Sequence, residues 1–424
     1  MLGAVTGRRH LSVAGRSCHH ETTATASQQE PSQHPAIDSD SPSTARRGPN
    51  SSSEVRDVTG RTFAIVQEYV PAYRAPLFDR LAEALSHTGD ELIVFAGDPA
   101  GALAQRRDGV QERPWLRRIR QRELRLFGKR LTVRVLPLDV WRADLIVVEQ
   151  ARRNLDLPLL LLWNRTARKT ALWGHGADVV KVPSRFERLY SRLITRKATW
   201  FFAYTPAGAE WAAGIGRDPQ RTTVLYNSTD VRLLREELAA VESTKSERQV
   251  AFIGGLDGSK NIAELIAIGE AAHRADPDFR LVIGGDGELR PTVESAAARF
   301  AWLDYRGAVS GAAKAALLRD SDLLLLPGRV GLVALDSLVA GRPIVTLASS
   351  LHGPEFGYLE PGRTCVVADG VEDAAWSLVR LLHERQELLT MQERCRRASE
   401  EYSVENMAHH FQDGLNAAIK DDND

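Results

Sequence analysis

The chain has 424 residues, of which 43% are hydrophobic, so it is long enough to form two domains with separate cores. Its 55 lysine and arginine residues balance 55 aspartate and glutamate residues, which excludes a nucleic-acid-binding protein defined by overall positive charge. The cysteines Cys18, Cys365 and Cys395 follow neither a disulfide framework nor a metal-binding spacing, which favours a reducing compartment.

The amino-terminal segment predicts a disordered extension over residues 1–60. It is rich in Ser, Thr, Pro, His and Gln and lacks periodic apolar positions, so it cannot bury enough surface to offset the entropy of ordering. The first residues lack the charged-then-apolar order of an export signal, and no run approaches the roughly 18 apolar residues that span a bilayer. We therefore expect a cytoplasmic protein, with any membrane contact peripheral, at the inner face of the membrane.

Alternating strands and helices from 61 to 235 predict a first Rossmann-like domain. Short apolar runs such as ADLIVVE are typical of buried parallel strands. The expected strands cover 63–67, 91–96, 131–135, 143–149 and 169–176. The expected helices cover 77–85 and 185–196, and a strand–loop–helix unit follows at 198–216.

This amino-terminal half carries most of the positive charge. Residues 61–230 hold 28 basic and 18 acidic residues, and the segment 106–134 alone holds eleven arginines or lysines against three acids. Such a segment favours contact with an anionic acceptor or with an anionic membrane surface. The alternative is a solvated, arginine-rich surface without a partner.

A charged helix and a polar connector over 231–248 predict a domain boundary. The strand–helix alternation then resumes, which predicts a second Rossmann-like domain over 245–385. The remaining helices, 386–424, are expected to pack back on the first domain. Two such domains would face each other across a cleft, because open parallel sheets bind ligands at the carboxyl ends of their strands.

The segment PGRVGLVALDSLVAGRPIV, residues 327–345, indicates the ligand class. A buried strand is followed by small residues where a helix begins, and a helix amino terminus favours anions. Asp336 lies about one turn further, where its carboxylate can accept hydrogen bonds from sugar hydroxyls. Phosphate and hydroxyl binding together suggest a nucleotide or a nucleotide-sugar, whereas the alternative is an ordinary βαβ unit with a solvent-facing aspartate.

Five motifs in order resemble a known family. They are FIGGLDGSKNIAELI, LVIGGDGEL, DYRGAV, GLVALDSLVAGRPIV, and HGPEF with the later Gly362. Over residues 61–410 the sequence resembles a GT-B glycosyltransferase and is most similar to glycosyltransferase family 4. The amino half, with QEYVPAYRAPLF and WGHG, resembles a bacterial branch of this family.

The resemblance implies a retaining, metal-independent, hexosyltransferase-like enzyme. It would move a sugar from a nucleoside diphosphate-sugar to an acceptor hydroxyl, in cell-envelope or polysaccharide glycan synthesis. The expected partners are the nucleotide-sugar donor and a glycan or lipid-linked acceptor, without nucleic acid. No cofactor is expected beyond the nucleotide-sugar as co-substrate, and no His, Cys or Asp cluster has metal-ligand spacing.

The donor-binding residues predicted by the resemblance belong to the second domain. Lys260 would place positive charge on the diphosphate leaving group, and the amides at the start of the 327–345 helix would add to it. Asp336 would bind the ribose. The full predicted donor set is Gly254, Gly255, Lys260, Arg306, Arg329, Val330, Gly331, Leu332 and Asp336.

Two catalytic residues are expected, His175 between two glycines at the end of a strand, and Glu355. His175 would hydrogen-bond the transferred sugar or stabilise an oxocarbenium-like state, and a structural histidine is the alternative. Tyr73 and Arg74, in the first loop, are expected on the acceptor side, although they too could be structural.

The sequence also departs from the family pattern. Gly328 stands where the family carries the first of two glutamates, Asp336 replaces the second, and Gly255 replaces an arginine. Arg329 and Glu355 could supply the missing charges. These departures leave open a degenerate protein that only binds a nucleotide-sugar. An NAD-linked oxidoreductase is a weaker alternative, because GGDG at 284–287 is not a full dinucleotide fingerprint.

Overall fold

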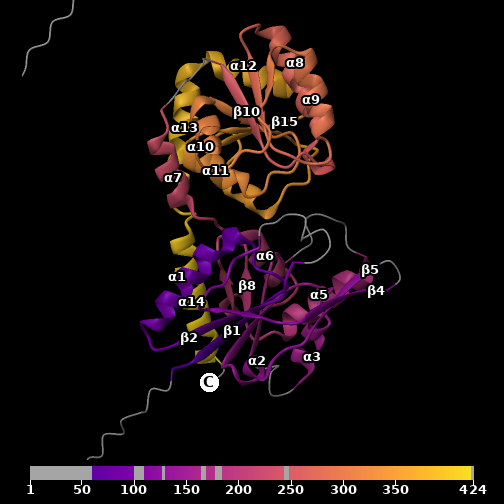
Figure 1. Cartoon of the computed structure of the whole chain (residues 1–424), viewed down its shortest axis with the longest axis vertical. Helices are drawn as coiled ribbons and strands as arrows, with labels where there is room; N and C mark the ends of the chain where they lie inside the picture. Colours follow the sequence, from indigo (N-terminus) through magenta and orange to yellow (C-terminus); the bar gives the residue numbers. More distant parts are fainter. Residues whose placement is uncertain are drawn as a thin grey trace, which may run out of the picture. The chain divides into compact units, whose positions relative to one another are not determined.

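The computed structural model describes residues 60–99, 109–126, 129–163, 169–176, 184–242 and 248–421. Apart from Gly60, the extension predicted over 1–60 lies outside these ranges. Within them the chain forms a seven-stranded and a six-stranded parallel sheet and one two-stranded hairpin (Figure 1). The predicted α/β fold with two Rossmann-like sheets is confirmed.

The first sheet has the strand order β3-β2-β1-β6-β7-β8-β9. Its strands are β1 (Thr62–Gln67), β2 (Glu91–Ala96), β3 (Leu116–Arg118), β6 (Leu145–Glu149), β7 (Thr170–Gly174), β8 (Phe201–Ala203) and β9 (Thr222–Val224). The helical segments between them are η1 (Ala72–Arg74), α1 (Ala75–Ser86), α2 (Leu138–Arg142), α3 (Asp156–Leu162), α5 (Arg185–Lys197), α6 (Pro206–Gly214) and η3 (Pro219–Arg221).

Helices cover both faces of this sheet, and strand β1 shows how the sequence achieves this. Phe63 and Ile65 belong to one apolar cluster, and Ala64 and Val66 belong to another. Alternate side chains of a strand point to opposite faces, so a strand buried on both faces reads as a continuous apolar run.

The basic segment forms an antiparallel hairpin of β4 (Gln121–Leu126) and β5 (Lys129–Arg134). The sequence predicts only the second of these strands. Strand β4 alternates charged residues with leucines that remain exposed, so it carries no core-facing stripe by which a strand is recognised.

The second sheet has the strand order β12-β11-β10-β13-β14-β15. Its strands are β10 (Gln249–Ile253), β11 (Arg280–Gly284), β12 (Leu303–Tyr305), β13 (Leu323–Leu325), β14 (Ile344–Leu347) and β15 (Cys365–Ala368). Its helical segments are α7 (Val231–Ala240), η4 (Gly258–Lys260), α8 (Ile262–Ala275), α9 (Arg290–Arg299), α10 (Gly311–Asp320), α11 (Val333–Ala340), η5 (Pro354–Tyr358), α12 (Val371–His383) and α13 (Arg385–Ala398).

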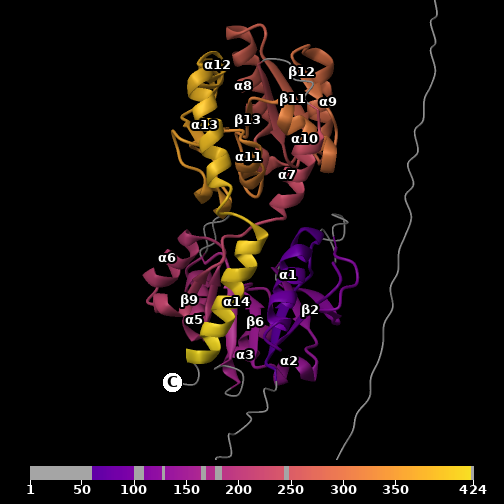
Figure 2. The ribbon, with the colours of Figure 1, turned by 90° about the vertical axis from the view of Figure 1, so that its left-hand side faces the viewer.

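The last helix, α14 (Val404–Asp421), packs on the first sheet rather than the second. It lies beside α1 in both ribbon views (Figures 1 and 2). Leu388 and Met391 of α13, by contrast, belong to the core of the second sheet. The chain therefore returns to the first core between α13 and α14.

In each sheet the chain adds strands on one side of the first strand and then continues on its other side, so a switch point lies between β1 and β6 in the first sheet. In the second sheet the corresponding switch point lies between β10 and β13, so the loops after these two strands are neighbours at the carboxyl edge. Ligands of open α/β sheets bind at such points. No helix within the described ranges combines the length and apolar character needed to cross a membrane.

Candidate functional site

The loop after β10 carries the predicted donor lysine. This loop packs closely on the loop after β11 because Gly285 there has no side chain: a Cβ atom placed on Gly285 would lie 2.0 Å from the carbonyl oxygen of Gly254. The chain then turns through η4, where the Asp257 side chain accepts from the backbone N–H of Ser259. Lys260 ends this turn, and its Nζ donates to the backbone carbonyl of Arg329 at 2.6 Å.

Gly328 allows the loops after β10 and β13 to touch. A Cβ atom at Gly328 would lie 2.3 Å from the carbonyl carbon of Lys260 and 2.5 Å from the carbonyl oxygen of Ser259. No real Cβ atom fits at such distances, so this backbone arrangement excludes any side chain at 328. The glutamate that the sequence lacks here could not be introduced without moving Lys260.

Lys260 and Arg329 give this point a concentrated positive charge. Burial lowers the pKa of Lys260, Arg329 lowers it further, and Asp257 opposes both effects. Although burial alone would raise the pKa of Asp257, its hydrogen bonds from Ser259 and the charges of Lys260 and Arg329 lower it. The Nε atom of Arg329 is buried without a hydrogen-bond partner among the described residues. A buried, unsatisfied donor beside a lysine suits an anionic ligand.

The predicted amide cradle is only partly open to a ligand. The backbone N–H of Val330 donates to Nδ1 of His352 at 3.3 Å, and the His352 ring stacks on Phe356. Burial lowers the pKa of His352, which favours the neutral ring that can accept this bond. Gly331 and Leu332 precede α11, where amides lack partners within the helix. In the sequence, His352 carries no signal beyond its place in the motif HGPEF.

Asp336 lies in the first turn of α11, but it has a partner of its own. Its Oδ1 accepts from Nζ of Lys314 on α10 at 2.9 Å, and both side chains are mostly buried. Burial raises the pKa of Asp336, while Lys314 lowers it. A sugar hydroxyl would therefore share this carboxylate with a lysine. Arg306, the remaining predicted donor residue, is exposed and pairs with Asp304 at 2.6 Å.

Glu355 is buried beside the start of α11 and is held from outside the second sheet. Its Oε1 accepts from Nδ2 of Asn227 at 2.6 Å. Its Oε2 would lie 4.0 Å from a Cβ atom on Gly331. The hydroxyl of Tyr358 donates to the carbonyl of Asn227, whose own N–H donates to the carbonyl of Tyr204. No sequence pattern marks Asn227 or Tyr358 as functional, because their contacts with Glu355 and with each other span more than a hundred residues of sequence.

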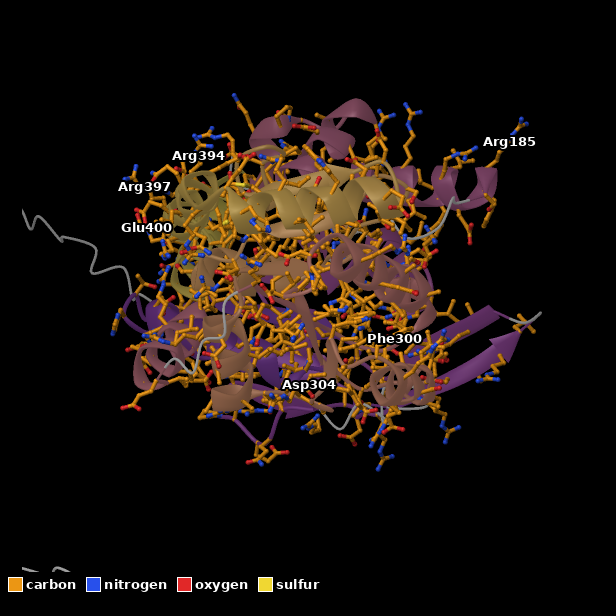
Figure 3. The ribbon with its side chains drawn as sticks, turned by 90° about the horizontal axis from the view of Figure 1, so that it is seen from above. Arg185, Phe300, Asp304, Arg394, Arg397 and Glu400 are labelled. Carbon is orange, nitrogen blue, oxygen red and sulfur yellow. The ribbon has the colours of Figure 1, made fainter. Side chains whose placement is uncertain are left out.

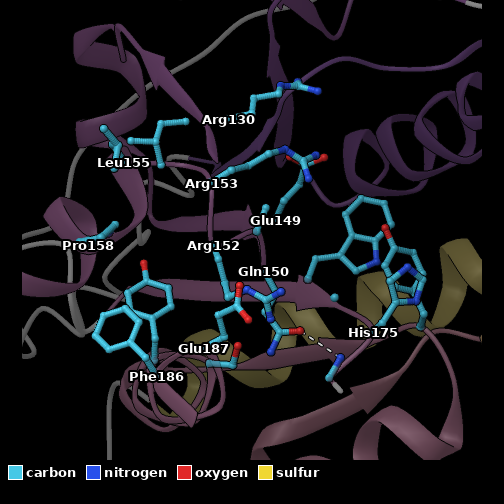
Figure 4. A pocket seen from close by; sticks show the side chains of 18 of the residues that line it. Arg130, Glu149, Gln150, Arg152, Arg153, Leu155, Pro158, His175, Phe186 and Glu187 are labelled. Atoms are coloured by element: carbon cyan, nitrogen blue, oxygen red, sulfur yellow. Dashed lines mark hydrogen bonds between the residues drawn. The ribbon is translucent and has the colours of Figure 1, made fainter. Parts of the chain in front are cut away.

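His175 follows β7 and lines a cavity of about 820 Å³ (Figure 4). The ring of His175 stacks on Tyr204, with centroids 4.2 Å apart. Next to it, the N–H of Gly176 donates to the side chain of Gln150 at 2.9 Å, which fixes the turn after the strand. Other residues lining the cavity include Arg130, Glu149, Arg153, Leu155, Phe186 and Pro354.

The two predicted acceptor-side residues differ in their surroundings. Tyr73 is 41% exposed, whereas Arg74 is buried with its guanidinium about 5 Å from the ring centres of Trp173 and Tyr204. Burial by itself would lower the pKa of Arg74, but Tyr204, Tyr73 and Glu355 raise it above its ordinary value. Arg74 therefore carries positive charge between the residue stacked on His175 and the carboxylate of Glu355.

A partly buried ion network, which no sequence pattern predicts, borders the cavity through Arg130, Glu149 and Arg153. Glu68, which follows β1, pairs with Arg130 of the hairpin and with Arg153. The backbone N–H of Glu68 donates to Glu149 at 3.0 Å. Next to this pair, Arg134 makes two hydrogen bonds to Asp156. The hairpin arginines counted in the basic segment are therefore partly neutralised inside the molecule.

Comparison with known proteins bears on this arrangement. Residues 247–384, which contain Lys260, Gly331, Asp336 and Glu355, match the protein family described as glycosyl transferases group 1. Two strains of Mycobacterium tuberculosis have a protein named GDP-mannose-dependent alpha-(1-6)-phosphatidylinositol dimannoside mannosyltransferase that is 30% identical over 212 residues. This match covers 44% of the chain and 55% of that relative, so the chain spans about half the length of the curated relatives it matches.

Solved structures share the fold at low sequence identity. Anabaena HepE in complex with UDP has a TM-score of 0.56 at 15% identity, covering 84% of this chain and 99% of that one. Sucrose-phosphate synthase from Thermosynechococcus elongatus has a TM-score of 0.57 at 17% identity, covering 83% and 97%. These likenesses establish the GT-B fold, and together with the match to group 1 they confirm the resemblance seen in the sequence.

Proposed function

We propose that this chain transfers a sugar from a nucleoside diphosphate-sugar to an acceptor hydroxyl. The match of residues 247–384 to the group 1 glycosyltransferase family and the GT-B fold support this proposal. One observation carries the proposal. Lys260 and Arg329 meet the start of α11 at the switch point of the second sheet, where Gly328 lets the two backbones touch. Cationic side chains and helix amides at such a point suit a diphosphate.

The same charges would support the chemical step. As the bond between the anomeric carbon and the phosphate oxygen breaks, negative charge develops on the departing diphosphate. Preorganised positive groups in a partly buried site stabilise that charge, which accounts for the proposed independence from a metal. Asp336, paired with Lys314, would accept from a ribose hydroxyl.

Retention of configuration follows from the family resemblance. The acceptor oxygen would form its bond to the anomeric carbon on the face that the phosphate leaves, and the acceptor proton would pass to the departing phosphate. In this scheme His175 orients the sugar and Glu355 holds its hydroxyls. Their closeness to Arg74 and Tyr204 supports a shared site.

The acceptor is proposed to be a glycan or a lipid-linked molecule of the cell envelope, reached from the inner membrane face. The curated mycobacterial relatives, named as mannosyltransferases acting on a phosphatidylinositol dimannoside, support the lipid-linked class. Their name specifies GDP-mannose, and HepE was solved with UDP, so GDP and UDP are the first nucleotides to test.

Calorimetric titration of UDP, GDP and ADP tests the donor site. We expect one of them to bind, and we expect His175→Ala to keep that affinity while lowering turnover by at least about tenfold, because interactions made in the transition state act on rate. Turnover should be unchanged by a chelator. If a nucleotide binds but no sugar is transferred from its nucleotide-sugars, the chain is a degenerate protein that only binds a nucleotide-sugar. A product with inverted anomeric configuration would contradict the retaining mechanism. If no nucleotide binds, the proposed glycosyltransferase function is wrong.

A further inference from the structure

Helix α5 exposes an apolar stripe to solvent. Phe186, Leu189 and Leu193 are 74%, 64% and 54% exposed, at the i, i+3, i+7 spacing of one helix face. The helix has an ordinary buried face as well, where Ile194 and Thr195 pack inward. The exposed stripe is therefore a second apolar surface beyond the one that holds the helix in place.

Helix α3 extends this surface. Leu159, Leu162 and Trp163 are each at least 60% exposed, and Leu155 at the start of the helix is partly exposed. Helices α3 and α5 contact each other (Figure 1). Large apolar side chains gathered on neighbouring elements, rather than scattered singly, mark an interaction surface. We call these residues of α3 and α5 the α3–α5 face.

Basic side chains flank the apolar stripe. Arg185, Arg188, Arg192 and Arg196 recur along the exposed part of α5, followed by Lys197, and Arg185 extends away from the ribbon in Figure 3. The helix has one acid, Glu187, and its side chain accepts from the backbone N–H of Ser184 in a capping box. A helix with apolar and basic residues side by side complements an anionic lipid surface, where the apolar stripe enters the acyl boundary and the arginines meet headgroups.

The α3–α5 face borders the cavity that contains His175. Leu155, Pro158 and Phe186 lie along one side of this cavity, with His175 on the opposite side (Figure 4). A headgroup could enter the cavity while its acyl chain stays with the apolar stripe. By contrast, four arginines of the basic segment 106–134 already pair with acids of the chain: Arg113, Arg118, Arg130 and Arg134.

We propose that the α3–α5 face docks the protein on an anionic lipid bilayer and presents lipid-anchored acceptors to the cavity. The proposal of docking stands on this surface alone, and the presentation of acceptors rests on the proposed function. In this proposal the membrane contact lies on α3 and α5, whereas the sequence predicts it at the basic segment 106–134. Docking also narrows the acceptor to a lipid-anchored molecule.

Sedimentation of the full chain with vesicles tests docking. We expect binding to vesicles of equal parts phosphatidylglycerol and phosphatidylcholine, weaker binding as salt rises, and little binding to phosphatidylcholine alone. The double variant Leu189→Ser, Leu193→Ser should lose at least about tenfold in vesicle affinity, and Arg192→Glu several-fold. Leu233→Ser on α7 and Arg394→Glu on α13 are matched exposed controls and should bind as the native chain does.

The outcomes separate docking from transfer. Three results would overturn the proposal: native-like vesicle binding by the α5 variants, equal binding to neutral and anionic vesicles, or no binding at low salt. Equal binding to neutral vesicles would show that the contact does not depend on lipid charge. Nucleotide titration without vesicles checks the donor site and the fold of each variant. If nucleotides fail to bind while vesicle binding responds as expected, the docking surface stands and the proposed function falls. As a second readout, vesicles with brominated lipid should quench the tryptophan fluorescence of the native chain more than that of the Trp163→Phe variant.

Discussion

At the scale of single residues, the surroundings of Lys260 set the pH range in which it can bind phosphate. Burial and Arg329 lower its pKa, so its charge is lost at a lower pH than that of an exposed lysine, whose pKa is about 10.4. Nucleotide affinity should therefore fall as pH rises, and the fall should begin below that ordinary value. Calorimetry across alkaline pH measures this directly.

Two substitutions of Lys260 test this prediction. Lys260→Ala should weaken nucleotide binding by roughly 10- to 100-fold at neutral pH, because a charge-assisted hydrogen bond contributes about 1.5–3 kcal/mol. Lys260→Arg keeps its charge and should remove the alkaline decline. Lys420→Ala, exposed on α14, is the control. If nucleotide affinity still declines at alkaline pH in Lys260→Arg, the titration of another group causes the decline.

Also at this scale, Asn227 fixes Glu355 in place. Asn227→Ala leaves the buried carboxylate without its 2.6 Å donor, and we expect turnover to fall by roughly 10-fold or more. Asn227→Asp should be worse at neutral pH, because two facing carboxylates repel and one of their pKa values rises. Lowering the pH protonates that pair and should partly restore Asn227→Asp but not Asn227→Ala. Asn406→Ala, exposed on α14, is the matched control, and parallel pH profiles for the two Asn227 variants would contradict the assignment.

At the scale of elements, the loops after β10 and β13 form one unit because Gly328 has no side chain. Gly328→Ala places a methyl group against the Lys260 backbone, so we expect a loss of about 1–3 kcal/mol in the free energy of unfolding and weaker nucleotide binding. Urea unfolding and calorimetry measure the two effects. Gly214→Ala, at the exposed end of α6 where a Cβ meets nothing within 4 Å, should leave nucleotide affinity unchanged and should not lower the free energy of unfolding. Unchanged nucleotide affinity in Gly328→Ala would mean that the loop contact does not position the donor site.

At the scale of the whole molecule, α14 completes a core that begins more than three hundred residues earlier. The Phe411 ring stacks on Phe202 with centroids 4.6 Å apart and meets Trp173 edge-on. Phe411→Ala should lower the free energy of unfolding by about 3–5 kcal/mol, as expected for a fully buried aromatic side chain. Leu389→Ala, on the exposed side of α13, should cost far less. Thermal and urea unfolding of both variants measure these changes. Equal losses in the free energy of unfolding would contradict the packing of α14 in the core of the first sheet.

The two parallel sheets and most of their elements can be predicted from the sequence, because strands buried on both faces are continuous apolar runs and amphipathic helices repeat their own period. The sequence also identifies the glycine-rich loops that meet at Lys260, since such loops carry local signals. Strand β4 escaped prediction because its leucines face solvent and match no core.

Which charges are available to a ligand and which are already paired depends on the three-dimensional packing and cannot be predicted from the sequence. Asp336 faces Lys314, Glu355 is held by Asn227, and Arg134 is paired with Asp156 inside the molecule. These partners are 22, 128 and 22 residues apart in sequence. No local period or propensity encodes such pairings, because they arise from the packing of separate elements. The exposed stripe on α5 likewise cannot be predicted from the sequence, because the packing of separate elements decides which face of the helix is buried.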